Sequence, residues 1–203
     1  MNRLVLGLLL LGVAASGSAT SLASLTSGGS IHNGAAYGQS VTTPNGGPWD
    51  NIDFNFMDDS NNYAIGGLYV LTEAYTGAPG DLSPSTAGYL GFTSTITDGV
   101  WNFSGVTLSS DTQYFFYMDS IVPLGQGVDL VSPSAYAGGN TYAAGGGTFV
   151  SFSGYDMEFV LAGDQVSNTP EPGTLALVAC GLGLAASISS GVDGAFMPTP
   201  GGY

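Results

Sequence analysis

Basic side chains are almost absent from this chain. Of its 203 residues only one is Lys or Arg, namely Arg3, against fifteen Asp and Glu, which gives a formal charge of −14 at pH 7. Proteins that bind nucleic acid use Lys and Arg to displace counterions from phosphates, and anionic lipid headgroups attract the same side chains. The composition therefore excludes nucleic acid and anionic headgroups as partners.

Cysteine and histidine are equally scarce, with one residue of each, Cys180 and His32. A single cysteine cannot form an intrachain disulfide, a redox pair or a Cys-based zinc site. A Ser-His-Asp triad would need His32 as its base, but the sequence has no Gly-x-Ser-x-Gly turn, and the Gly-rich surroundings favour a mobile segment or an edge strand. We therefore expect no catalytic residue, no metal ion and no cofactor.

The rest of the composition is that of a folded domain. Charged residues make up 8% of the chain and apolar residues 44%, with 11 Tyr and 10 Phe among them. Such a chain has enough apolar surface to build a core, so it is not a disordered polyanion. Without disulfides, this core must be held by packing alone.

The first 19 residues have the three parts of a secretory signal peptide. Arg3 is followed by an apolar run over residues 4–15, and the small residues Gly17 and Ala19 stand at the −3 and −1 positions of a signal-peptidase site. Ala23 is a second possible cleavage position, and a buried N-terminal helix is the alternative. Removal of residues 1–19 would also remove Arg3 and change the formal charge from −14 to −15.

The last part of the chain contains a proline-flanked glutamate followed by an apolar segment. Pro170, Glu171 and Pro172 lie in a linker over residues 167–173, and residues 174–190 carry no charge. Seventeen residues at ~1.5 Å each approach the thickness of a bilayer core, and the segment has no polar face. Because residues before proline avoid the helical region, the linker should be extended and open to a processing enzyme.

This combination closely resembles the C-terminal sorting signal of PEP-CTERM proteins. In that family, a Pro-Glu-Pro motif, a membrane helix and a basic tail are recognised by exosortase, an integral-membrane enzyme of Gram-negative bacteria that make exopolysaccharide. The resemblance implies that Pro170, Glu171 and Pro172 form the sorting motif. It also implies an inner-membrane stage before processing, followed by a place at the cell surface or outside the cell.

The tail departs from the family pattern, because residues 191–203 contain no Lys or Arg. Cytoplasmic Lys and Arg fix the orientation of a membrane helix, so the tail lacks its usual stop-transfer signal. A plain membrane anchor and an apolar segment packed on the domain remain alternatives for residues 174–190.

Between these ends, residues 20–166 have the pattern of an all-β domain, a β-sandwich or jelly roll. Short β-rich runs alternate with Gly-, Pro- and Asn-containing turns, and no run of ten or more residues has helical periodicity. The expected strands cover residues 51–56, 68–71, 88–92, 100–103, 113–118, 148–152 and 155–161. Trp49 and Trp101 are expected in the core.

A second resemblance supports this fold. The segments Gly-Ala-Pro-Gly-Asp-Leu and Val-Thr-Leu-Ser-Ser-Asp-Thr-Gln-Tyr-Phe-Phe, within residues 68–116, are similar to ectodomains termed choice-of-anchor. Residues 154–161 resemble their last strand. The resemblance implies a β-sandwich and no assigned chemistry.

Acidic residues offer two further candidates. Paired carboxylates could serve a glycosidase, but adjacent strand positions face opposite sides, and most of these acids lie in turns where they cap the backbone. Residues 50–62 are rich in oxygen ligands for Ca²⁺, although the Gly and Glu of an EF-hand loop are missing. The acids considered for a pair are Asp53, Asp58, Asp59, Glu73, Asp156 and Glu158.

Two functions follow from the sequence. The first is an exported, non-catalytic protein of the cell envelope or extracellular matrix, processed by signal peptidase and exosortase, with extracellular polysaccharide as a candidate partner. The second is a secreted carbohydrate-binding or carbohydrate-active module, which would use exposed aromatic rings to stack on sugars. A groove with exposed rings or two carboxylates ~5–10 Å apart would favour the second.

Overall fold

The computed structural model describes residues 19–56, 66–124 and 127–166 as an all-β domain of antiparallel sheets. The predicted all-β class is confirmed, and the described residues contain no α-helix, only the short 3₁₀ helix η1 (Pro79–Asp81). Arg3, Gly17, the motif Pro170–Glu171–Pro172 and the apolar segment 174–190 lie outside the described residues. Among those residues, no helix is long and apolar enough to cross a bilayer.

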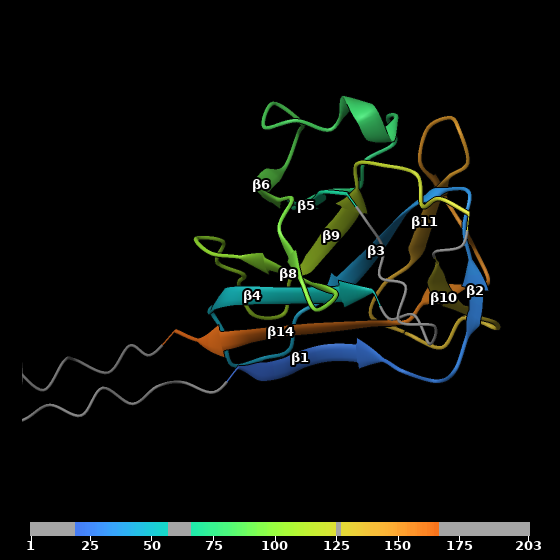
Figure 1. The fold of residues 1–203 in the computed structure, drawn as a ribbon. Helices are drawn as coiled ribbons and strands as arrows, with labels where there is room; N and C mark the ends of the chain where they lie inside the picture. Colours follow the sequence, from blue (N-terminus) through green and yellow to red (C-terminus); the bar gives the residue numbers. More distant parts are fainter. Residues whose placement is uncertain (1–18, 57–65, 125–126, 167–203) are drawn as a thin grey trace, which may run out of the picture. The chain divides into compact units, whose positions relative to one another are not determined.

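Three sheets make up the domain (Figure 1). The five-stranded sheet has the order β1 (Thr20–Leu25), β14 (Phe159–Gln165), β4 (Trp49–Phe56), β8 (Val100–Phe103) and β7 (Ile96–Thr97). The six-stranded sheet has the order β12 (Val150–Ser151), β11 (Thr141–Ala144), β3 (Ala36–Thr42), β9 (Gln113–Met118), β5 (Leu68–Leu71) and β6 (Tyr89–Thr93). The three-stranded sheet has the order β13 (Asp156–Met157), β10 (Val128–Val131) and β2 (Ser30–His32).

The five- and six-stranded sheets face each other across an aromatic core. Phe54 of β4 stacks on Phe116 of β9, with ring centroids 4.2 Å apart, and lies parallel to Phe159 of β14 at 5.8 Å. Phe56 packs edge-on against the fully buried Trp101. These contacts make the fold sandwich-like, and the predicted burial of Trp49 and Trp101 is confirmed.

The outer face of the six-stranded sheet carries a second aromatic layer. Tyr117 and Phe115 of β9 point away from the core described above, and Tyr142 of β11 packs edge-on against both rings. Tyr75 and Phe149 cover Tyr117 from two loops, and the backbone N–H of Tyr75 donates to the Tyr117 hydroxyl at 3.1 Å. Burial of this phenol raises the pKa of Tyr117 well above its usual range.

Gly38 of β3 lies directly under the Tyr117 ring, where a Cβ would clash with ring carbons Cδ1 and Cε1. We expect Gly38→Ala to lower the free energy of unfolding by about 1–3 kcal/mol, because neither the sheet nor the buried ring can move away cheaply. Urea denaturation gives this difference directly. Gly145→Ala is the matched control, since a Cβ there meets nothing within 4 Å, and equal losses in the two variants would contradict the expectation.

A buried polar cluster fixes the three-stranded sheet to the six-stranded one. The Gln39 side-chain oxygen accepts hydrogen bonds from the Thr141 hydroxyl at 2.7 Å and from the Met157 N–H at 3.2 Å. The same Met157 N–H also donates to the Thr141 hydroxyl oxygen at 2.9 Å. Strands β3, β11 and β13 are thereby held together without a charged group, which positions β10 and β2 beyond β13.

Candidate functional site

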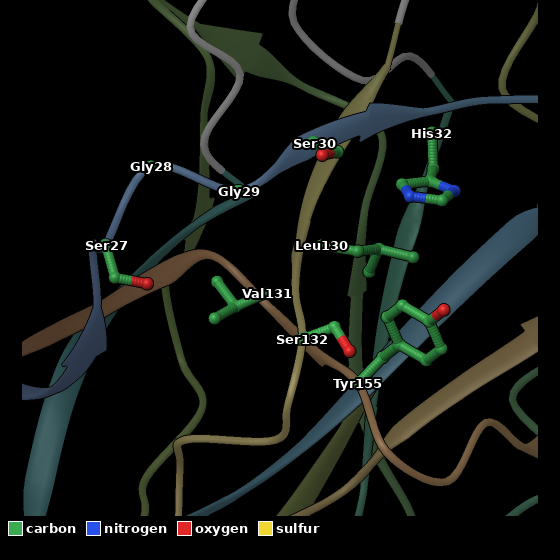
Figure 2. Close-up of a pocket in the computed structure, with 9 residues that line it drawn as sticks. All are labelled: Ser27, Gly28, Gly29, Ser30, His32, Leu130, Val131, Ser132 and Tyr155. Atoms are coloured by element: carbon green, nitrogen blue, oxygen red, sulfur yellow. The ribbon is translucent and has the colours of Figure 1, made fainter.

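A polar cavity of about 410 Å³ opens beside the edge strand β2 (Figure 2). Its wall is formed by the turn before β2, by β2 itself, by β10 and the residue after it, and by the loop before β13. The lining residues are Ser27, Gly28, Gly29, Ser30, His32, Leu130, Val131, Ser132 and Tyr155. This cavity brings together segments from opposite ends of the domain sequence.

Strand pairing determines which side chains of β2 line the cavity. Ser30 and His32 are paired with Leu130 and Val128 of β10, and the alternation of a strand places Ser30 and His32 on one face. Ile31 lies between them on the opposite face and is 49% exposed. His32 therefore lies on an edge strand, one of the two positions that its Gly-rich surroundings predicted.

The turn before β2 is held by a buried carboxylate behind the cavity wall. Glu158 is only 2% exposed, and its Oε1 atom accepts hydrogen bonds from the N–H groups of Ser27 at 2.6 Å and Gly29 at 3.0 Å. Gly29 also approaches β10 so closely that a Cβ would lie 2.7 Å from the Leu130 carbonyl oxygen. The carboxylate thus shapes the cavity without lining it.

Two rings meet at the other side of the cavity. The imidazole of His32 and the phenol of Tyr155 are arranged edge to face, with centroids 6.3 Å apart (Figure 2). Tyr155 also stacks on Phe152 at 4.6 Å, with the two rings nearly parallel. Phe152 therefore supports Tyr155 from outside the cavity and limits the positions its ring can take.

The hydrogen-bonding groups of the cavity are not used within the described part of the chain. The hydroxyls of Ser27, Ser30, Ser132 and Tyr155 and both imidazole nitrogens make no hydrogen bond to another described residue. Among the residues that the structure describes, no carboxylate lines the cavity, and no serine hydroxyl is bonded to His32. The arrangement can bind a polar molecule, but it does not activate a serine as a triad does.

The acidic residues considered for a pair have structural partners where the structure describes them. Asp156 is fully buried, and its Oδ2 atom accepts hydrogen bonds from the Ser134 hydroxyl and from the N–H groups of Ala135 and Tyr136. Asp53 accepts a hydrogen bond from the Asn102 amide at 2.7 Å. Glu73 is exposed in the loop after β5.

The remaining acids, Asp58 and Asp59, belong to the segment considered for calcium binding. Asp58 and Asp59, and with them half of the candidate calcium segment 50–62, lie outside the described residues. Within the ranges that the structure does describe, no group of three or more His, Cys, Asp or Glu side chains is placed to hold a metal ion.

Comparison with known proteins gives no relative for this chain: no family model, curated protein or solved structure is detectably similar to it.

Sequence reasoning found His32 but not its neighbours in the cavity. Ser27 and Ser30 belong to the same Gly-rich segment, and a Gly-Gly-Ser turn before a strand is a signal that could have included them. Ser132 and Tyr155 reach the site only through the pairing of β10 with β2 and with β13. No local signal marks them.

Proposed function

We propose that this chain is an exported, non-catalytic protein of the cell envelope or extracellular matrix. In this proposal, residues 1–19 direct export as a signal-peptide helix, and residues 174–190 form a transmembrane helix. Exosortase processes the chain at a PEP-CTERM-type signal centred on Pro170, Glu171 and Pro172. The β-sandwich is the part that remains outside the inner membrane.

The observation that supports the proposal most directly is the pairing of the first and last strands. Thr20 at the start of β1 is paired with Gly163 near the end of β14, and the two strands are antiparallel neighbours (Figure 1). The chain therefore enters and leaves the sandwich at the same end of one sheet. This arrangement is compatible with a domain that is attached to its flanking segments at one end only.

The start of β1 also supports one of the two proposed signal-peptidase positions. Cleavage after Ala19 leaves β1 complete from Thr20 onward. Cleavage after Ala23 would remove most of the strand, including Leu22, which is 8% exposed and packs in the core. Burial of one leucine contributes about 1.5–3 kcal/mol, and this contribution supports the proposal of cleavage after Ala19.

The C-terminal end of the sandwich is compatible with the proposed linker. The N–H of Val166 donates to the carbonyl of Pro48 at 2.9 Å, one residue after the end of β14. Residues of the proposed linker, 167–173, follow directly. Val166 is thus the last described residue, and the cleavage proposed here falls beyond it.

Intact-mass spectrometry of envelope and medium fractions tests this proposal. We expect a mature species that begins at Thr20 and ends close to Pro170, because both cuts would then fall outside the strands. Retention of residues 191–203 in the membrane fraction would contradict processing and reduce the segment to an anchor.

A matched pair of variants sharpens the mass measurement. Glu171→Gln changes the proposed motif, and Glu73→Gln makes the same chemical change in an exposed loop of the sandwich. We expect the first variant to keep its C-terminal segment and the second to be processed normally. Equal processing of both would argue against recognition of the motif.

The non-catalytic part of the proposal is supported by the cavities of the sandwich. In three cavities formed by described residues, at most one carboxylate lines the wall, and that one is Asp119. Its Oδ1 atom already accepts hydrogen bonds from the Gly67 N–H and the Ser120 hydroxyl. A glycosidase needs two carboxylates facing one groove, so these cavities do not favour hydrolysis.

A further inference from the structure

We propose that the cavity beside β2 is a binding site for a neutral saccharide of one or two sugar units. The proposal concerns binding alone, and it rests on the lining residues, the charges around them and the size of the space. It does not depend on how the ends of the chain are processed.

The charges of the protein select a neutral ligand. No Lys or Arg occurs after Arg3, so a phosphate, sulfate or carboxylate group would find no cation, only a domain with a large negative charge. A cationic ligand would need a carboxylate in the wall, where the described residues place none. Glu158, behind the wall, already accepts two backbone hydrogen bonds from the turn. Charged ligands of both signs are therefore disfavoured.

The polar groups of the wall select a ligand with many hydroxyls. Four side-chain hydroxyls and one imidazole line the cavity without partners among the described residues. A hydroxyl can both donate and accept, so it matches the hydroxyls of a sugar in either orientation. An apolar ligand would leave all five groups unpaired and would lose affinity.

The aromatic ring and the size of the cavity also favour a small saccharide. One face of the Tyr155 ring stacks on Phe152 at 4.6 Å, and the ring lies T-shaped to His32 at 6.3 Å, so these neighbours restrict its motion. A ring restricted in this way can pack against the C–H groups of a sugar with little further loss of side-chain freedom. A cavity of about 410 Å³ lies within the range of small-molecule sites, which is ~300–1,000 Å³, at its lower end.

Calorimetric titration of the full chain, purified in mild detergent, tests the proposal. The probes are neutral di- and trisaccharides of glucose, galactose, mannose, xylose and N-acetylglucosamine, with trigalacturonate as an anionic control. We expect at least one neutral probe to saturate the protein below about 10 mM and trigalacturonate not to bind. Binding of trigalacturonate as tight as that of the neutral probes, or no binding of any neutral probe, would overturn the proposal.

Two variants locate the binding. Tyr155→Ser removes the ring and should weaken the best probe about tenfold, which corresponds to the upper range of aromatic contributions. Ser30→Leu, at an exposed strand position, fills the cavity and should abolish binding.

The matched control is Tyr89→Ser, a tyrosine that lines another cavity at β6. It should leave affinity unchanged. Weakening by Tyr89→Ser but not by the two cavity variants would place the sugar elsewhere and overturn the assignment. Because mass spectrometry reads the chain ends and titration reads the cavity, failure of the processing proposal and failure of this one are distinguishable.

Discussion

Replacement of Asp156 with alanine is expected to lower the free energy of unfolding by about 3–5 kcal/mol. The side chain is completely buried, and its Oδ2 atom accepts hydrogen bonds of 2.6 Å from Ser134, 2.8 Å from Ala135 and 2.7 Å from Tyr136. Hydrogen bonds to a charged acceptor contribute about 1.5–3 kcal/mol each, and their loss leaves buried N–H groups without a partner. Urea denaturation followed by tryptophan fluorescence measures the change.

Two controls separate the role of these hydrogen bonds from that of the negative charge. Asp156→Asn keeps one acceptor oxygen, so we expect it to lose less stability than the alanine variant. Asp164→Ala removes an exposed hydrogen bond from the Asn51 amide and should cost less than about 1 kcal/mol. A loss for Asp156→Ala as small as that for Asp164→Ala would show that the loop over residues 134–136 does not depend on the carboxylate.

Replacement of Phe54 with alanine is the second change expected to have a large effect, also about 3–5 kcal/mol. Phe54 has three aromatic neighbours, with centroids 4.2 Å away at Phe116, 4.7 Å at Phe56 and 5.8 Å at Phe159. Because Phe116 belongs to the facing sheet, the cavity left by the ring would lie between the two sheets and could not collapse easily.

The same urea experiment on Phe92→Ala provides the comparison. Phe92 is 41% exposed on the edge strand β6, so its truncation should cost only about 1 kcal/mol or less. A smaller loss for Phe54→Ala than for Phe92→Ala would mean that the two sheets are not held together by this aromatic core.

Much of the strand pattern could be predicted from the sequence, because those strands alternate or are rich in β-branched and aromatic residues. The predictions for residues 68–71, 100–103 and 113–118 coincide with β5, β8 and β9. Strand β3 was missed because it carries Gly38, Gln39 and Ser40, a combination typical of a turn. These residues are buried for reasons that lie elsewhere in the chain: Tyr117 covers the glycine, and Thr141 bonds the glutamine.

Local sequence patterns also failed to predict the ends of some strands and the strands that contain buried acidic residues. Strand β10 contains the buried Asp129, and such a residue in a short run argues against a strand. The predicted strand over residues 155–161 divides at Glu158, because β13 joins the three-stranded sheet and β14 joins the five-stranded one. Strand β14 then continues to Gln165 through pairing with β1 and β4.

The cavity shows the same division between local and long-range information. The composition alone predicted a protein without binding sites built from Lys or Arg. An edge strand was one of the two positions predicted for His32. The contact between the His32 and Tyr155 rings depends on the pairing of β10 with β2 and with β13. It also depends on the conformation of the loop before β13. A single sequence holds no pattern that links residues so far apart.

The neutral donors that hold the acidic side chains of this sandwich have a consequence for its response to salt. The carboxylates of Asp53, Asp119, Asp156, Glu158 and Asp164 are held by amides, hydroxyls and backbone N–H groups, never by Lys or Arg. Dissolved salt weakens attraction between opposite charges, but here it can only relieve repulsion between like ones. We therefore expect the stability of this domain to rise with added salt, whereas a protein built on ion pairs would lose stability.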